Sequence, residues 1–493
     1  MKKSILALGA AVAVGGLGFA GAAHAVVFFG ADPAPVATAP AAATALELNP
    51  GAVGHMLYTP YFNTQASTAT LINITNTDTI NGKAVKVRFR GAANSDDLLD
   101  FTLLLSPGDV WTANVQTLNG FSALTTTDTS CTLPAIPAAG APLVSNRLPS
   151  YVADVANQTR EGYIEILNMA DIPVNPNTSS LYASIKHKAG TPLNCGAAAV
   201  QSVLLDGSTN PTAAGLHGAT GGLMGSWALV NQGELAVYSG NMPAVRAVSA
   251  SGVNGTAYIN IAPQLAVAYD AGRAFTADPL YKPVALNGAG KTPLYYDVPD
   301  MSTPLFAGVT PEQQIVRMDI LHNAVMNEYV ADKDGAVPMT TDWVVSQPTR
   351  RYYAAVDYGS SATTAQKIEN SLITPNPYAG ATLQTVGGMP MLCVAGSVGT
   401  SDREEGSIAT GAQFSPGTAA SFCGEVFTLS FGGNGSVLNA LVTNQAAPAA
   451  GKAGWGYVSL VGSQRLPIVG FSATSAANRA AGGNYGVTLP HRW

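Results

Sequence analysis

The sequence predicts a mainly β protein with two antiparallel β-sandwich domains, Ig-like or jelly-roll-like in form, and a few short helical insertions. Segments of alternating apolar and polar residues recur in both halves, and Gly, Pro and Asn residues separate them. Charged residues make up only 11% of the chain, and Thr, Ser, Asn, Gly and Ala take their place, as in packed extracellular β-structure. No repeat of fixed period is visible, which disfavours solenoids and propellers.

The first 25 residues have the features of a cleaved Sec signal peptide. Lys2 and Lys3 form a positive start, an apolar run covers 5–20, and cleavage is expected after Ala25. The chain is therefore expected to cross the inner membrane of a bacterium and to work in the envelope or outside the cell. The next residues, 26–49, are rich in Ala and Pro, cannot build a core, and are expected to form a flexible arm.

The charge and hydropathy of the mature chain exclude two classes of partner or anchor. Loss of the signal peptide leaves 22 basic and 30 acidic side chains, a net charge of −8. No block of Lys or Arg is present, so nucleic acid is not an expected partner. No later stretch reaches the roughly 18 consecutive apolar residues of a membrane-spanning helix, so no transmembrane segment is expected after the signal.

The first predicted domain, 50–270, is a β-sandwich with a helical insertion. Thr68–Thr75 and Lys83–Arg90 alternate in polarity and flank Asn81-Gly82, which predicts a hairpin with a tight turn. A short helix is expected over Cys195–Leu205, with Asn194 as its N-cap. The further strands predicted in this domain are Phe101–Leu105, Val110–Val115, Tyr163–Leu167, Trp227–Val230, Leu235–Tyr238 and Tyr258–Ile261.

The second predicted domain, 271–493, is also β-rich and contains one helix. Thr310, Pro311 and Gln313 form an N-terminal capping signal, which predicts a helix near 311–329. The Pro- and Gly-rich residues 262–304 are either a domain boundary or a long surface excursion. The strands predicted after the helix are Trp343–Val345, Tyr352–Val356, Val426–Phe431 and Tyr457–Val461.

The four cysteines indicate disulfides, because their number is even and the chain is exported. Three pairings are possible. We favour Cys131 with Cys195 and Cys393 with Cys423, because each pair then stays within one half of the chain. No CxxC or CxxH spacing is present, so a zinc or iron site is not indicated.

The usual catalytic motifs are missing from the sequence, and we predict that the protein is not an enzyme. No nucleophile elbow of the form G-x-S-x-G occurs. The five histidines of the mature chain have no paired ligand spacing, so each is expected to be structural. A secreted hydrolase with two converging acidic or Ser/His groups stays an alternative, because separations in space cannot be inferred from a sequence.

Two acidic loops are candidate calcium sites. Asp96, Asp97 and Asp100 crowd one loop, and Asp332 and Asp334 precede Gly335 in a fragment of a calcium-loop pattern. The glutamate that would close an EF-hand loop is missing after Asp334. Solvated turn carboxylates are the simpler interpretation of both groups, so we expect no required cofactor and keep calcium as a conditional ligand.

Four segments resemble a family of proteobacterial cell-surface proteins, some of which are similar to surface-layer (S-layer) subunits. They are TNTDTINGKAVKVRFRGAANSDDLLDFTLLLSPGDVWTA (75–113), EGYIEILNMAD (161–171), TDWVVSQPTRRYY (341–353) and the ending GNYGVTLPHRW (483–493). The resemblance implies a protein displayed on the outer face of a Gram-negative envelope. It brings no catalytic residue with it. The large aromatic residues in these segments, Trp111, Trp343 and the Tyr352-Tyr353 pair, are expected to fill sandwich cores.

We therefore expect an extracellular structural protein that self-assembles as an S-layer-type subunit. Its expected partner is itself, in a homo-oligomer or lattice, with outer-membrane lipopolysaccharide as a further candidate. A secreted adhesin or glycan-binding β-sandwich protein is the main alternative. An outer-membrane β-barrel ranks below both, because Pro490 interrupts the alternating strand before Trp493 and most other strands are too short to span a membrane.

Overall fold

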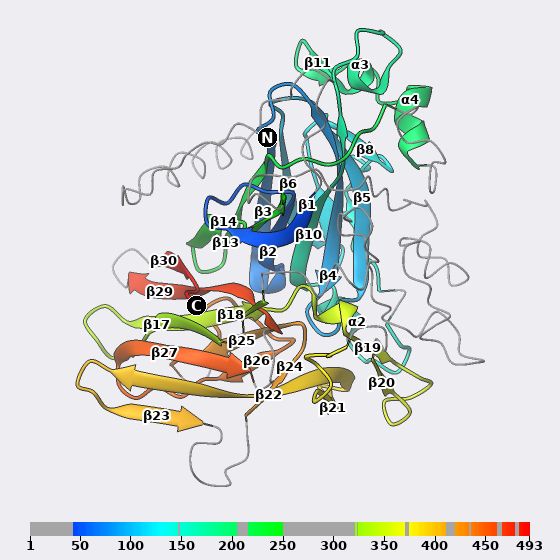
Figure 1. Cartoon of the computed structure of the whole chain (residues 1–493). Helices are drawn as coiled ribbons and strands as arrows, with labels where there is room; N and C mark the ends of the chain where they lie inside the picture. The colour runs from blue at the N-terminus through cyan, green and yellow to red at the C-terminus, as the bar shows by residue number, and fades with distance from the viewer. Residues whose placement is uncertain are drawn as a thin grey trace.

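A computed structural model describes residues 43–145, 148–204, 215–249, 321–322, 324–369, 374–410, 420–432, 435–460, 466–478 and 483–493. Within these ranges the protein is mainly β, with several antiparallel sheets and a few short helices, as the sequence predicts. The strands of the N-terminal half, blue to green in Figure 1, lie above those of the C-terminal half, yellow to red. No helix in this part of the chain is long and apolar enough to cross a membrane.

The N-terminal half is a sandwich of two antiparallel sheets. The seven-stranded sheet has the order β1 (Ala43–Asn49), β15 (Ala244–Ser249), β2 (Met56–Asn63), β10 (Glu161–Ile172), β4 (Gly82–Gly91), β5 (Asp97–Leu105) and β8 (Cys131–Leu133). The six-stranded sheet has the order β14 (Ala236–Asn241), β13 (Leu223–Asn231), β3 (Thr68–Asn76), β6 (Val110–Leu118), β7 (Phe121–Thr125) and β9 (Ala141–Pro142).

The core of the sandwich forms because one face of each strand is apolar. Val87 and Phe101 of the first sheet and Ile74 and Trp111 of the second are buried together. The rings of Phe101 and Trp111 lie 5.7 Å apart between the sheets. Trp111 is fully buried, so its predicted place in the core is confirmed.

A small helical insertion follows β10 and packs on one end of this sandwich. Its elements are α3 (Leu181–Ile185), the two-stranded pair β11 (His187–Lys188) and β12 (Thr191–Pro192), α4 (Ala198–Gln201) and η2 (Ser202–Leu204). The predicted helix is present but shorter. Asn194 is not its N-cap: its side chain accepts a hydrogen bond from Gly196, and Ala197 caps α4 without a side-chain bond.

The C-terminal half is built on one large curled sheet of eleven strands. Its main path runs β21 (Thr382–Val386), β22 (Met389–Asp402), β27 (Ala453–Leu460), β17 (Ala324–Asp332), β18 (Met339–Ser346), β25 (Val426–Ser430) and β26 (Asn444–Ala446). The strands that join beside this path are β23 (Ser407–Thr410), β24 (Ala420–Cys423), β29 (Val469–Asn478) and β30 (Gly483–Pro490). Two further pairs are β16 (Leu321–His322) with β28 (Leu466–Pro467) and β19 (Ala354–Asp357) with β20 (Gln366–Glu369).

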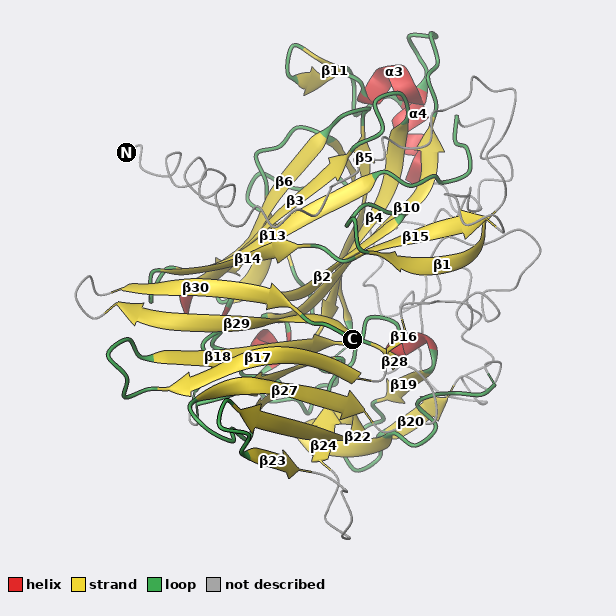
Figure 2. Cartoon of the chain, turned by 60° about the vertical axis from the view of Figure 1, so that its left-hand side comes forward, coloured by secondary structure: helices red, strands yellow, loops and turns green. Residues whose placement is uncertain are grey.

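The curl of this sheet encloses a second core. Trp343 is fully buried there and lies 4.7 Å from Phe431, which stacks on Tyr329 at 4.8 Å between ring centroids. Tyr353 is also buried in this core. The predicted core role of Trp343 is therefore confirmed. The edge-on view of Figure 2 shows the order of the strands from β30 down to β23.

The two halves share buried apolar contacts and do not pack as separate bodies. Phe471 of β29 lies 4.4 Å from Trp227 of β13, ring centroid to ring centroid, inside the N-terminal core. Val344 and Leu438 of the C-terminal half belong to the same core. Strand β30 also runs beside β14, where the amide of Asn484 donates to the carbonyl of Glu234 at 3.2 Å.

The predicted hairpin around Asn81-Gly82 is wrong. The two strands exist, but β3 belongs to the six-stranded sheet and β4 to the seven-stranded sheet. The connection crosses the sandwich, and Asp78 holds it by accepting hydrogen bonds from the amides of Ile80 and Asn81, both at 2.9 Å. Two alternating strands around a turn signal can form a hairpin or can cross between the sheets of a sandwich. In both cases one face of each strand lies in the same core, so the sequence pattern is the same.

Three other local predictions need correction. The helix expected near 311–329 is not helical over 324–329, where the chain forms β17, since packing in the curled sheet outweighs a local cap signal. The arm expected over 26–49 ends earlier, because 43–49 form β1 beside β15. The strand expected at Tyr352 starts at Ala354, after a 3-10 turn. The signal peptide, Tyr258–Ile261 and the domain boundary at 270/271 lie outside the described residues.

Candidate functional site

A group of ionisable side chains lies buried between the two halves. We call Arg90, Glu165, Arg350, Arg351 and Glu425 the junction cluster. All five are at most 1% exposed. Such burial of charges is rare in proteins unless the charges are paired, so the contacts of this cluster are the first place to look for a function.

Strands β4 and β10 bring the N-terminal charges of the cluster to one face of the seven-stranded sheet. The register places Glu165 opposite both Tyr58 and Arg88, and Arg88 opposite Asp100. Residues on this face alternate with the apolar residues of the sandwich core. The face would be solvated in an isolated sandwich, yet Arg88 and Glu165 have no exposed surface.

Consecutive arginines of the 3-10 turn η6 (Arg350–Tyr352) connect the halves. One guanidinium nitrogen of Arg351 donates to both carboxylate oxygens of Glu165, at 2.8 and 2.9 Å. Arg90 lies 3.5 Å from the same carboxylate. Arg350 points the other way and pairs with Glu425 at 2.6 Å. The turn therefore provides one cation to each half.

Glu425 sits beside a backbone position that favours glycine. Gly424 has a φ of +97°, in the left-handed region, and its carbonyl accepts a hydrogen bond from Arg350 at 2.8 Å. Burial raises the pKa of the Glu425 carboxyl, and the neighbouring Arg350 opposes this shift. The amide of Glu425 donates to the carbonyl of Ala92 at 2.8 Å, so this segment is also fixed to the N-terminal half.

The first acidic loop predicted as a calcium site lies at the same junction and has protein partners. Asp96 accepts a hydrogen bond from the hydroxyl of Tyr358. Asp97 lies 3.9 Å from Arg90, and Asp100 lies 3.7 Å from Arg88. All three aspartates are buried. Asp97 and Asp100 therefore lie beside cations of the protein itself, and Asp96 is hydrogen-bonded to a tyrosine hydroxyl.

The second acidic loop is separate and exposed. Asp332, at the end of β17, pairs with Lys452 at 2.8 Å. The hydrogen bond from Lys452 lowers the pKa of Asp332 below its ordinary value. Asp334 is exposed in the turn that follows. Across the described ranges, no group of three or more His, Cys, Asp or Glu side chains is arranged to hold a metal ion.

A second buried polar group fixes the segment 436–443 against the N-terminal half. Glu161 of β10 accepts hydrogen bonds from the amides of Leu441 and Val442, at 2.7 and 3.3 Å, and from the side chains of Tyr61 and Gln65, at 3.2 and 3.3 Å. Within the described ranges no cation pairs with Glu161, and burial raises the pKa of its carboxyl from 4.5 to about 7.

Asp342 of β18 holds the beginning of the same segment. Its carboxylate accepts hydrogen bonds from the hydroxyl of Ser436 and, at 3.2 Å, from the amide of Leu438. Burial raises the pKa of Asp342 from 3.8 to about 6. Glu161 and Asp342 thus differ from the carboxylates of the junction cluster, because hydrogen-bond donors surround them in place of guanidinium groups.

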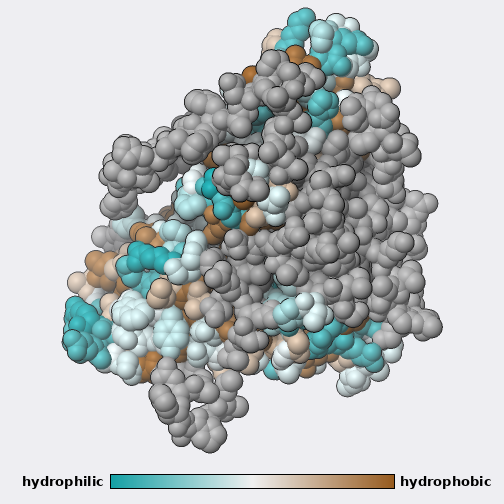
Figure 3. Space-filling view, viewed as in Figure 1, coloured by the Kyte–Doolittle hydropathy of each residue, from teal (hydrophilic) through white to brown (hydrophobic). Residues whose placement is uncertain are grey.

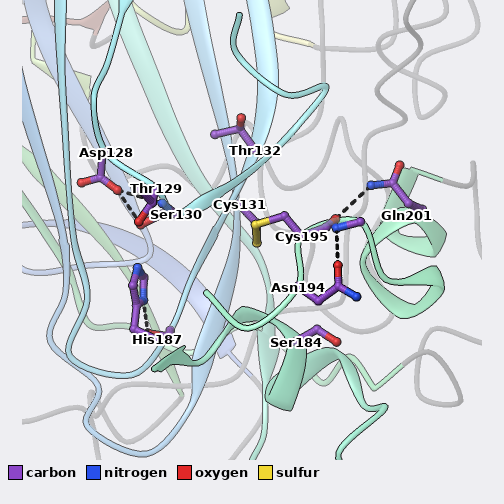
Figure 4. Close-up of a disulfide and its surroundings, with 12 residues drawn as sticks. Asp128, Thr129, Ser130, Cys131, Thr132, Ser184, His187, Asn194, Cys195 and Gln201 are labelled. Carbon is purple, nitrogen blue, oxygen red and sulfur yellow. Dashed lines mark hydrogen bonds between the residues drawn. A yellow bond between two sulfur atoms is a disulfide. The ribbon is translucent and has the colours of Figure 1, made fainter. Parts of the chain in front are cut away.

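Both disulfides have the favoured connectivity. Cys131 pairs with Cys195 and joins β8 to the helical insertion, as Figure 4 shows. Cys393 pairs with Cys423 and joins neighbouring positions of β22 and β24. Among the histidines, His55 and His491 are buried and hydrogen-bonded to backbone groups. Burial lowers the pKa of His491 to about 4, so it is neutral at physiological pH.

One hollow opens to solvent near the junction, beside the 3-10 turn η1 (Gln65–Ser67). Its volume is about 480 Å³, and its lining comes from Thr64, Ala66, Ser67, Thr68, Ala69, Gln116, Thr117, Arg160 and Gln232. This lining contains one cation and no carboxylate. The acidic and basic side chains near this hollow belong to the buried groups described above. Their contacts hold the two halves together.

Sequence reasoning missed the junction cluster, although four of its five residues, all except Glu425, lie in the segments that carry the family resemblance. Arg90 is in 75–113, Glu165 in 161–171, and Arg350 and Arg351 in 341–353. The C-terminal segment also meets the junction region, through a contact of His491 with the carbonyl of Val344 at 2.8 Å. Comparisons with protein-family models, curated proteins and solved structures give no match, so the resemblance stays a proposal.

Proposed function

We propose that this chain is an exported structural protein of a Gram-negative cell surface, whose copies associate as S-layer subunits do. The observation that carries the proposal is the chemistry of the strands that end the large sheets. Of these six strands, β8, β14, β21 and β26 contain neither a charged residue nor a proline, whereas β9 contains Pro142. The sixth, β1, contains Glu47, which pairs with Arg246. Proteins that stay monomeric usually protect such strands with charges or proline.

Strand β21 is the clearest example. Its residues Thr382, Gln384 and Thr385 are exposed, and it ends the eleven-stranded sheet beside β22. An uncharged end strand presents unpaired backbone groups to which a strand of another copy can add. We infer that copies of the chain associate through edges of this kind.

The distribution of charge supports the same proposal. Strand β4 contains Lys83, Lys86, Arg88 and Arg90, and none of the four has exposed surface. The chain has few charged residues and buries several of them. Its surface therefore consists largely of Thr, Ser, Asn and small residues. Such a surface costs less to desolvate than a charged surface when copies pack together. The junction cluster keeps the two halves in one fixed arrangement, as a regular assembly requires.

The proposed environment and partners follow from the same features. Two disulfides are typical of proteins from oxidising compartments. The mature chain is net negative, so calcium between copies would relieve repulsion between exposed carboxylates such as Asp334. Lipopolysaccharide of the outer membrane is the proposed anchor for such a layer.

Sedimentation velocity of the mature protein tests association directly. The wild type should form larger species as its concentration rises. Thr385→Lys in β21 should need an about tenfold higher concentration to form the same species, which corresponds to about 1.4 kcal/mol of association free energy. The matched control is Thr363→Lys, which adds the same charge to an exposed turn and should behave as the wild type does. If the wild type stays monomeric at high concentration with calcium present, the proposal is refuted.

A further inference from the structure

Two of the five tryptophans lie at the surface, although the large apolar area of a Trp side chain usually makes its burial strongly stabilising. Trp455 is 49% exposed and Trp493 is 57% exposed, whereas Trp111, Trp227 and Trp343 are buried. Trp455 lies on β27, in the middle of the eleven-stranded sheet and away from its end strands. A single exposed apolar residue is common, but a contiguous group of them marks a contact surface, so the neighbours of Trp455 decide its meaning.

Register places other large side chains next to Trp455. Antiparallel pairing puts Glu328 of β17 opposite Trp455, and Met326 opposite Tyr457. Because residues two apart on a strand face the same side, these four side chains share one face of the sheet. Arg492 joins them, since its backbone pairs with Met326 through hydrogen bonds of 2.8 and 3.0 Å. We call Met326, Glu328, Trp455, Tyr457 and Arg492 the aromatic face.

The ring of Tyr457 lies over the neighbouring strand β22. A Cβ atom on Gly399 would come within 2.3 Å of this ring, so glycine is required there for the ring to rest on the backbone. The register confirms that Gly399 is opposite Tyr457 and that Ser401 is opposite Trp455. The ring of Tyr457 therefore lies along the sheet, on the same face as Trp455 and Ser401. Figure 3 shows brown, pale and teal residues intermixed on the part of the C-terminal half that is visible in that view.

Charged groups border the aromatic rings on one side. Arg492 lies 3.5 Å from Glu328, and both side chains are more than half exposed. The pair is neutral as a whole, offers donors from the guanidinium and acceptors from the carboxylate, and stays in contact with water. Both groups can bind two neighbouring hydroxyls at once, because their paired N–H groups or oxygens match that spacing.

We propose that the aromatic face binds a neutral carbohydrate chain, with sugar rings on Trp455 and Tyr457 and their hydroxyls on Glu328 and Arg492. The C–H side of a sugar ring packs against aromatic rings, while its hydroxyls need the polar partners found here. An open sheet face can hold an extended polymer along its length, whereas free small molecules usually need a concave pocket. The net negative charge of the chain disfavours an acidic polymer.

A second copy of this chain is the competing occupant, and it fits less well. A protein surface laid on the aromatic face would remove the Glu328–Arg492 pair from water, and that desolvation is costly for an exposed ion pair. Sugar hydroxyls replace the lost water contacts one by one. Carbohydrate binding at this face is independent of the association through strand edges proposed above, so either can fail without the other.

Affinity electrophoresis of the mature protein tests the inference. Native gels would contain hydroxyethylcellulose, laminarin, dextran or galactomannan, each in a separate gel. We expect at least one polysaccharide to retard the wild type, and Trp455→Ala and Tyr457→Ala each to weaken the retardation about tenfold, as expected for one aromatic contact. Phe121→Ala is the control, because Phe121 is an exposed aromatic residue of another sheet.

Glu328→Gln distinguishes a specific site from a sticky surface. This variant keeps the fold, since Glu328 is exposed, and it should weaken the same retardation while Phe121→Ala leaves it unchanged. Absence of retardation in all four gels overturns the proposal, as does retardation that Trp455→Ala leaves intact. If Trp455→Ala instead lowers the sedimentation coefficient and no polysaccharide binds, the face is a contact between copies and the proposal is also overturned.

Discussion

Glu161→Gln provides a quantitative test of how the two halves are joined. The Glu161 carboxylate accepts hydrogen bonds from the amides of Leu441 and Val442 across the junction. Its folded-state pKa is raised from 4.5 to about 7 by burial. The folded protein therefore holds this proton more tightly than the unfolded chain does. Between pH 4.5 and 7 the folded state binds more protons, so stability must fall as pH rises.

The size of this effect follows from the two pKa values. A difference of this size corresponds to about 3 kcal/mol of unfolding free energy, fully present below pH 4.5 and lost by about pH 7. Glutamine has nearly the same shape and keeps the acceptor for the two amides, while its NH₂ group can donate to the hydroxyl of Tyr61. The variant should therefore lose the part of the pH dependence that comes from Glu161 and become more stable than the wild type at pH 8, by up to about 3 kcal/mol.

Urea unfolding at several pH values, followed by Trp fluorescence, measures this difference. The quantity of interest is the unfolding free energy of Glu161→Gln minus that of the wild type, plotted against pH. Asp342 titrates in the same direction, with a pKa of about 6, but it is present in both proteins and cancels. Glu404→Gln, in an exposed turn, is the control and should follow the wild type. Parallel curves for Glu161→Gln and the wild type between pH 4.5 and 8 would refute the reasoning.

Three further predictions concern the junction, the insertion and calcium. Arg351→Met leaves Glu165 buried with fewer partners, so it should lower the unfolding free energy in urea by about 3 kcal/mol; an unchanged midpoint would contradict the assigned role of the pair. Replacing both Cys131 and Cys195 by serine opens a link of sequence separation 64, which should cost up to about 4 kcal/mol in the same assay. Excess chelator should weaken assembly measured by light scattering, and scattering that does not change would remove calcium from the account.

Sequence patterns located most strands, because one apolar face per strand is a local property. They did not reveal how the strands combine. The crossing between β3 and β4 has the same local pattern as a hairpin, and the capping signal at Thr310 was stronger than any strand signal at 324–329. Those residues form β17 because β27 pairs with them along their whole length.

The junction cluster could not be predicted from local sequence, since its partners are far apart in the chain. Arg351 and Glu165 are 186 residues apart. The alternation of Lys and Arg with apolar residues in β4 is typical of a strand with one solvated face. Only contacts with the second half, such as that of Arg351 with Glu165, reveal that this face is buried. Likewise, no local pattern distinguishes the exposed Trp455 from the buried Trp343.

Negative-stain electron microscopy of gently washed cells and of the purified mature protein, with and without calcium, tests the central claim most directly. The account predicts a regular lattice or large ordered oligomers, on the cells and in the purified sample, and less order when calcium is removed. Dispersed single particles in every sample would contradict a self-assembling surface protein.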